Sequence, residues 1–180
     1  MMIFSFSNTL NSIVIGIDYK LAPISKFPDI FDENYKVYRK IVQNCEKLFG
    51  FKINKLALSG DSCGGHFCLN ILKNCIKDNI KKPDGLLLIY PSTRVIFDNM
   101  SPSFGMSCRD PLIQISLLGH TQNTVLELEK FKLENYHDQD TLNFFLTDSS
   151  IIKQFPKTYI IVATNDPLKD ESYMLADFLL

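Results

Sequence analysis

The stretch Leu56-Ala57-Leu58-Ser59-Gly60-Asp61-Ser62-Cys63-Gly64-Gly65 decides the fold of this chain. An apolar run leads into the pattern Gly-x-Ser-x-Gly, and a segment with helical spacing follows from His66 onward. This order predicts a strand, a sharp turn and a helix, which together raise a serine hydroxyl above the C-terminal edge of a parallel sheet. Glycines on both sides of the serine let the strand and helix backbones approach closely. Ser62 is therefore a candidate nucleophile.

The composition of the 180 residues is typical of one globular domain. Apolar residues make up 46% and charged residues 22%, which argues against disorder. The net charge of −1 gives no electrostatic basis for binding nucleic acid. The five cysteines include no C-x-x-C pair, so we expect free thiols and no metal site. No apolar run is long enough to span a bilayer, and residues 1–6 lack the features of a signal peptide. We expect a cytoplasmic protein.

Apolar segments of strand length alternate along the chain with segments of helical periodicity. Strands are expected at residues 12–19, 55–59, 86–90 and 158–163, and helices at 31–49, 66–76, 111–120 and from 167 onward. A second amphipathic segment is expected near residues 126–133. This alternation predicts an α/β fold with a parallel sheet flanked by helices. We expect a single domain over residues 1–180, in which residues 91–154 form an irregular, partly cap-like insertion.

Several motifs together resemble, in their order, the hormone-sensitive-lipase family of α/β-hydrolases. They are Asp18-Tyr19-Lys20-Leu21-Ala22-Pro23 with Phe27-Pro28, the Gly60–Gly65 stretch, Pro83-Asp84-Gly85, Tyr90-Pro91-Ser92, Asp110-Pro111-Leu112 and Asn165-Asp166-Pro167-Leu168-Lys169-Asp170-Glu171. The resemblance implies a serine hydrolase of carboxylic esters or acylglycerols that forms an acyl-enzyme on Ser62 and needs no cofactor. Its partner would be a small-molecule ester or acylglycerol substrate. We expect no binding to nucleic acid, and transient contact with a lipid surface stays open.

The resemblance also assigns roles around the serine. Asp166 would be the acid that orients a histidine base, and the backbone N–H of Cys63 would be an oxyanion donor. Gly60, Gly64 and Gly65 would be the glycines of the elbow. From the residues alone, Asp166 has an alternative role, because an aspartate directly before a proline is also an ordinary helix N-cap.

The catalytic histidine expected from the family has no counterpart in this sequence. In α/β-hydrolases the triad runs Ser, Asp, His along the chain, but His66, His120 and His137 all precede Asp166. His66 lies one helical turn after Ser62. At that position its side chain would not lie between Ser62 and Asp166, as a catalytic base must. The Gly-rich oxyanion loop H-G-G-G of the family is also not in the sequence.

These departures lead us to expect a partial α/β-hydrolase fold that lacks the family's N-terminal strands and its C-terminal, histidine-bearing segment. We expect the chain alone to be inactive. Two alternatives stay open beside an esterase. One is a non-catalytic ligand-binding protein on the same scaffold, since the gibberellin receptors resemble this family and have lost the histidine. The other is a non-functional gene fragment.

Overall fold

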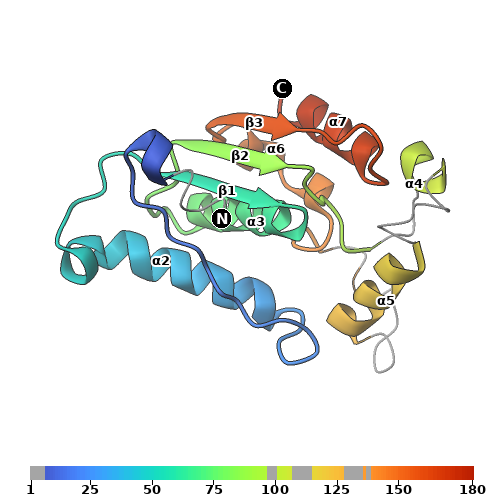
Figure 1. Cartoon of the computed structure of the whole chain (residues 1–180), viewed down its shortest axis with the longest axis horizontal. Coiled ribbons are helices and arrows are strands. Elements are labelled where there is room, and N and C mark those ends of the chain that lie inside the picture. Colours follow the sequence, from blue (N-terminus) through green and yellow to red (C-terminus); the bar gives the residue numbers. More distant parts are fainter. Residues whose placement is uncertain (1–6, 97–100, 107–114, 128–135, 137–138) are drawn as a thin grey trace.

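Three parallel strands form the centre of the structure. The computed structural model describes residues 7–96, 101–106, 115–127, 136 and 139–180. The strands are β1 (Ala57–Asp61), β2 (Gly85–Ile89) and β3 (Lys157–Ile161), hydrogen-bonded in the order β1-β2-β3. Their last residues, Asp61, Ile89 and Ile161, pair with one another across the sheet. The segments that follow the three strands therefore leave the sheet at one common edge (Figure 1).

Helices lie against the sheet and beyond that edge. They are α2 (Asp29–Phe49), α3 (Cys63–Lys77), α4 (Pro102–Met106), α5 (Ile115–Leu126), the 3-10 turn η2 (Phe144–Leu146), α6 (Ser149–Ile152) and α7 (Lys169–Phe178). Helix α3 packs on β1 and β2, and α2 packs on α3. Figure 1 shows α4 and α5 beyond the C-terminal ends of the strands, where the candidate site lies.

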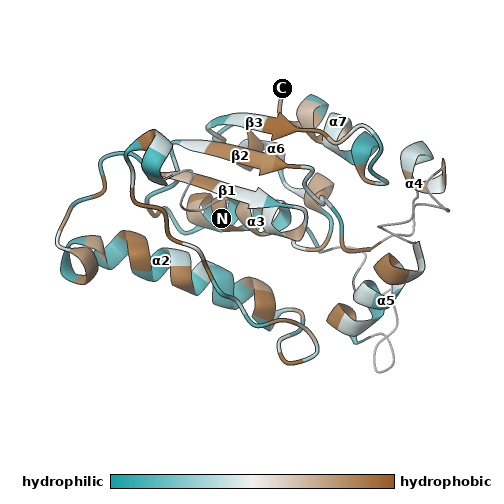
Figure 2. Cartoon of the chain, in the orientation of Figure 1, coloured by the Kyte–Doolittle hydropathy of each residue, from teal (hydrophilic) through white to brown (hydrophobic). Residues whose placement is uncertain are grey.

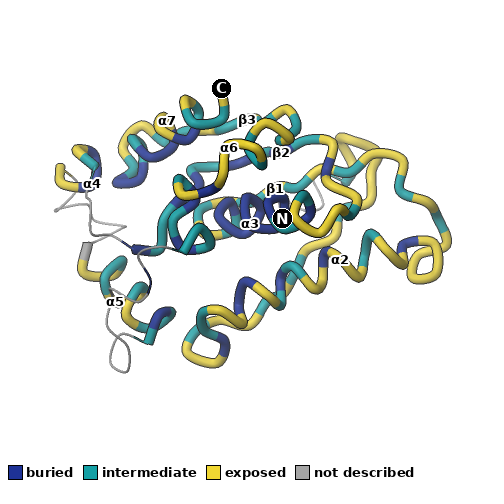
Figure 3. Tube along the Cα trace, turned by 180° about the vertical axis from the view of Figure 1, so that it is seen from behind, coloured by how far each residue is buried: buried dark blue, intermediate teal, exposed yellow. Residues whose placement is uncertain are grey.

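Helix α3 is buried along most of its length, as Figure 3 shows. One side packs against the sheet, where Leu69 and Leu72 meet Leu88 of β2 in a core cluster. The opposite side meets α2, where Cys75 and Tyr38 belong to a second cluster. A helix that contacts a sheet on one side and a helix on the other needs apolar residues on both. This explains why the segment after Ser62 has apolar residues on more than one side.

Helix α3 covers one face of the sheet, and the other face is more exposed. Successive side chains of a strand point to opposite faces, and Ile160 belongs to the core cluster under α3. Its neighbours Tyr159 and Ile161 therefore point to the other face, where they are 68% and 51% exposed. Figure 2 shows that β2 and the C-terminal half of β3 are hydrophobic. The sheet thus presents apolar side chains on a face that α3 does not cover.

Most of the predicted alternation is confirmed. Strand β1 begins and ends two residues later than expected, and the last helix begins at Lys169 instead of residue 167. Helix α2 matches the predicted periodicity, although Phe49 at its end is exposed. The helix expected at 111–120 corresponds to α5, which runs on to Leu126. The motif at 110–112, residues 128–133 of a second expected amphipathic segment, and His137 lie outside the described residues.

The predicted strand at residues 12–19 is wrong. This segment has no regular secondary structure, and Ile13 and Ile15 are 65% and 43% exposed. An apolar, β-branched run becomes a buried strand only where another strand edge receives its backbone groups. Among the described residues, β1 hydrogen-bonds in the sheet only with β2. The segment therefore has the composition of a strand without the pairing of one.

Candidate active site

Ser62 stands in the tight turn between β1 and α3. Its backbone angles are φ +51° and ψ −121°, a conformation that residues with a Cβ rarely adopt and that costs on the order of 1–3 kcal/mol. Three hydrogen bonds hold it there. The N–H of Ser62 donates to the carbonyl of Ile89 at 3.0 Å, and its own carbonyl accepts from the N–H groups of Gly65 and Ser92, each at 3.0 Å. The turn is therefore fixed to β2 and to the segment after it.

The glycines around Ser62 are not equivalent. A Cβ on Gly60 would lie 2.3 Å from the carbonyl carbon and oxygen of Gly64, and one on Gly65 would lie 2.7 Å from Cβ of Pro91. A Cβ on Gly64 would meet nothing closer than Oδ1 of Asp61, at 3.9 Å. Close backbone approach therefore requires glycine at 60 and 65. We expected close backbone approach to require glycine on both sides of the serine, but it does not require glycine at position 64.

Cys63 is the first residue of α3, and the D-Y-x-L-A-P segment lies against it. The amides of a first helical turn have no acceptor within the helix, so the N–H of Cys63 points out of the N-terminus beside Ser62. The hydroxyl of Tyr19 lies 3.5 Å from Sγ of Cys63, and the Tyr19 ring packs edge-on against Phe67. Burial, followed by the hydrogen bond with Cys63, raises the pKa of the Tyr19 phenol, so it is protonated at neutral pH. Sequence reasoning did not place Tyr19 at the site.

Asp166 lies in the loop between β3 and α7. Its Oδ1 accepts the N–H of Leu168 at 2.7 Å, and its carbonyl accepts the N–H of Lys169 at 3.1 Å. The expected N-cap role is not confirmed, because α7 begins at Lys169, its N-cap residue is Leu168, and the Asp166 side chain closes a turn ahead of the helix. Strand β2 separates β1 from β3, and neighbouring strands lie about 4.8 Å apart, so the strands that lead to Ser62 and Asp166 are roughly 10 Å apart at one sheet edge.

Comparison with known proteins agrees with this geometry. Residues 2–180 match the family model described as alpha/beta hydrolase fold. The chain belongs to the α/β-hydrolase fold family. Within it the chain is similar to hormone-sensitive lipase, with 33% identity to the human protein over 63% of this chain and 31% to the Bos taurus protein over 76%. It is also 30% identical to arylacetamide deacetylase of Rattus norvegicus over 89% of its length.

Solved α/β-hydrolase structures show the same fold. Carboxyl esterase 2 from Tuber melanosporum superposes with a TM-score of 0.88 at 21% identity, covering 99% of this chain and 56% of that one. An esterase from Pyrobaculum calidifontis gives 0.84 at 23% identity, covering 97% and 54%. The chain spans 10% and 17% of the human and Bos taurus lipases, and 43% of the deacetylase. No helix in the described part of the chain is both long and apolar enough to cross a membrane.

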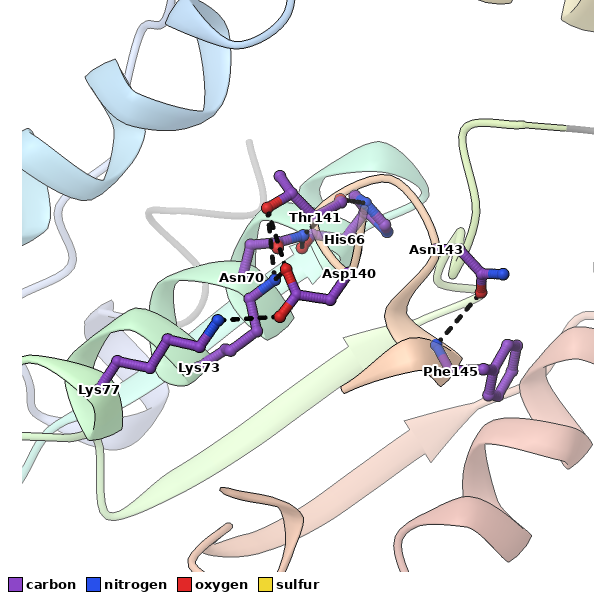
Figure 4. Close-up of polar contacts among 8 residues, drawn as sticks. All are labelled: His66, Asn70, Lys73, Lys77, Asp140, Thr141, Asn143 and Phe145. Atoms are coloured by element: carbon purple, nitrogen blue, oxygen red, sulfur yellow. Dashed lines mark hydrogen bonds and ion pairs between the residues drawn. The ribbon is translucent and has the colours of Figure 1, made fainter. Parts of the chain in front are cut away.

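In this α/β-hydrolase chain, His66 is not arranged as a base for Ser62. His66 is 2% exposed, with Nδ1 3.2 Å from the carbonyl oxygen of Ser92 and Nε2 2.7 Å from that of Thr141 (Figure 4). Burial lowers its pKa to about 4, although the two carbonyl groups oppose this shift. Both ring nitrogens of His66 thus lie against backbone carbonyls of two segments that follow β2, and a neutral imidazole donates to one of them at a time. His120 is exposed on α5, and His137 lies outside the described residues.

The same side of α3 continues into an ionic cluster in which Lys73 is buried, Asp140 is partly buried and Lys77 is exposed (Figure 4). Nζ of Lys73 lies 2.8 Å from Oδ1 of Asp140, and Nζ of Lys77 lies 2.8 Å from Oδ2. Burial lowers the pKa of Lys73 to about 8, against the effect of the carboxylate. Partial burial raises the pKa of Asp140, but the two ammonium groups outweigh this and lower it. Together with a bond from Asn70 to the carbonyl of Thr141, the cluster fastens the 140–141 segment to α3.

A buried acid, Glu171, links α7 to the segment that follows β2. Glu171 is 4% exposed, and its Oε2 accepts the Thr93 hydroxyl at 2.6 Å. Nε of Arg94 lies 4.0 Å from Oε1, and the Arg94 guanidinium lies over the ring of Phe145. Burial raises the pKa of Glu171, and Thr93 and Arg94 counter part of that shift. In this α/β-hydrolase the loop of Asp166 is therefore followed by a fixed helix. Sequence reasoning quoted Glu171 only as part of a motif.

Proposed function

We propose that this chain carries the nucleophile and the acid of a serine hydrolase of hormone-sensitive-lipase type, which acts on carboxylic esters or acylglycerols. The strongest support is the backbone of Ser62, held at positive φ by three hydrogen bonds at the exit of β1. Strained residues persist only where their surroundings fix them, and they cluster at functional sites. The names of the relatives, a lipase and a deacetylase, agree with an acyl substrate.

Each group has a defined role in this proposal. Oγ of Ser62 attacks the ester carbonyl carbon while a base takes the hydroxyl proton, and the alcohol leaves with that proton. The N–H of Cys63 stabilises the negative oxygen of the tetrahedral intermediate. Water then hydrolyses the acyl-serine and releases the acid. Asp166 orients the base, which in α/β-hydrolases is a histidine later in the chain.

We propose that these 180 residues alone turn over substrate slowly. No histidine follows Asp166 in the sequence, and both ring nitrogens of His66 face backbone carbonyls. Loss of the base of a serine triad lowers turnover by up to about 10⁶-fold. The same observations favour a second candidate function, in which the site binds an ester-like ligand without cleaving it.

The test supplies the base from solution. The purified chain is assayed with p-nitrophenyl butyrate, with and without added imidazole. Without imidazole we expect hydrolysis close to the buffer rate. With imidazole we expect a saturable increase over the Ser62→Ala variant in the same buffer, because that variant reports the reaction of free imidazole with the ester. Asp166→Asn should lower the saturable part, since the carboxylate would orient the imidazole.

Two outcomes contradict the proposal in different ways. Rapid hydrolysis without imidazole that depends on Ser62 would mean that a base is already present. No Ser62-dependent increase at any imidazole concentration would contradict the nucleophile. Thermal stabilisation of the chain by a short-chain ester that is not consumed would then support the binding function.

A further inference from the structure

Helix α4 meets the N-terminal end of α7 through one buried serine. Ser103 is 6% exposed. Its hydroxyl donates to the carbonyl of Pro167 at 2.8 Å and accepts the N–H of Asp170 at 3.1 Å. Its own N–H donates to Oδ2 of Asp170 at 2.8 Å. A single residue of α4 thus forms one hydrogen bond with the loop that joins β3 to α7 and two with Asp170 in the first turn of α7.

The bonds of the Ser103 hydroxyl reach residues on both sides of Leu168, whose N–H binds the carboxylate of Asp166. The N–H of Leu168 donates to Oδ1 of Asp166 at 2.7 Å. Leu168 lies between Pro167 and Asp170, the two residues that the Ser103 hydroxyl joins. The Ser103 hydroxyl therefore fixes the distance between the carbonyl of Pro167 and the N–H of Asp170. Ser103 belongs to α4, so a separate helix holds the turn that contains Leu168.

We propose that Ser103 is a positioning residue for Asp166, an inference that rests on the proposed function. A hydroxyl can donate and accept at once, which is what the carbonyl of Pro167 and the N–H of Asp170 together require. An alanine at 103 would leave both groups without this partner. The turn would widen, and the Asp166 carboxylate would move relative to a base beside Ser62. A displacement of 1 Å can cost about 10²-fold in a catalysed rate.

Amide hydrogen exchange, followed by NMR on the full 180-residue chain, tests the structural step. In Ser103→Ala we expect the N–H of Leu168 to exchange at least about tenfold faster, because it loses the support of the turn. The N–H of Leu88, in the centre of β2, should keep its rate. Ser103→Thr, which retains the hydroxyl, should restore slow exchange at Leu168. Unchanged exchange at Leu168 in the alanine variant, or an equal change at Leu88, overturns the proposal.

Ser101→Ala is the matched control. The Ser101 hydroxyl contacts Ser103 Oγ at 3.2 Å and the N–H of Phe104 at 3.4 Å, both within the α4 segment. Exchange at Leu168 should stay slow in this variant, and a rise as large as in Ser103→Ala would overturn the proposal. If Ser103→Ala does not fold, Asp170→Ala weakens the contact between Ser103 and α7 from the other side, because it removes the oxygen that accepts the Ser103 N–H. Unchanged Leu168 exchange in that variant has the same meaning.

The imidazole assay tests the functional step. Ser103→Ala should lose the part of the rescued rate that Asp166→Asn also loses, and the double variant should lose little more, because residues that act as a unit are not additive. Additive losses would overturn the positioning role. The two proposals can fail separately: no rescue in the unsubstituted chain rejects the proposed function, whereas rescue without this non-additivity rejects only the role of Ser103.

Discussion

At the scale of single residues, the elbow depends on two glycines and not on a third. We predict that Gly60→Ala destabilises the chain by roughly 3 kcal/mol or more, because the added Cβ would lie 2.3 Å from the backbone of Gly64 and neither backbone can move freely. Gly64→Ala should be neutral or stabilising by about 0.4–1 kcal/mol, since its Cβ meets only an ordinary contact and alanine has fewer unfolded conformations.

Urea unfolding followed by circular dichroism measures both changes. The two variants add the same methyl group on either side of the same serine, so each is the control for the other. Equal destabilisation by both would show that backbone approach at Gly60 is not the cause. The pattern Gly-x-Ser-x-Gly cannot separate these positions in the sequence, because the difference lies in which backbone atoms come near each glycine after folding.

At the scale of elements, the charged cluster on α3 fastens a distant segment. We predict that Asp140→Asn lowers the free energy of unfolding by about 2–3 kcal/mol, because it leaves Lys73, whose side chain is 1% exposed, without its carboxylate. Lys73→Met should change stability by less than about 1 kcal/mol, since it removes the buried charge and leaves Asp140 paired with Lys77.

The pH dependence of unfolding gives an independent check. The two ammonium groups hold the pKa of Asp140 below its ordinary value of 3.8. Its stabilisation is therefore complete above about pH 4 and is lost as the pH falls through the lower, folded-state pKa. The Asp140→Asn variant should lose this component of the acid dependence. A larger loss for Lys73→Met than for Asp140→Asn would contradict this account of the cluster.

The sequence predicted some strands and site residues of this chain correctly and missed others. Segments whose partners lie in the described chain, such as β2 between β1 and β3, were predicted within one or two residues. Residues 12–19 are also apolar and β-branched, but none of the three described strands pairs with them, and local composition cannot report that. Tyr19 and Ser103 were missed for a related reason. Their hydrogen-bond partners, Cys63 and Asp170, lie 44 and 67 positions away, so no local pattern connects them.

At the scale of the whole molecule, one face of the sheet remains uncovered in the described structure. Parallel sheets are almost always covered on both faces, because their strands are apolar on both sides. Here Tyr159 and Ile161 are 68% and 51% exposed, on the face opposite α3, because their neighbour Ile160 packs in the core cluster under α3. Exposed apolar groups on the edge strand of a sheet are a common origin of association between chains.

We predict that the purified chain self-associates at micromolar concentration and binds the dye ANS. Tyr159→Thr with Ile161→Thr should weaken both, because threonine keeps the β propensity of the strand and removes most of the apolar surface. The control is Tyr173→Thr with Met174→Thr, which removes two side chains that are 54% and 43% exposed on α7. Sedimentation velocity measures the association. If the two pairs reduce it equally, general surface hydrophobicity is the cause, whereas an effect confined to the first pair assigns the association to the uncovered face of the sheet.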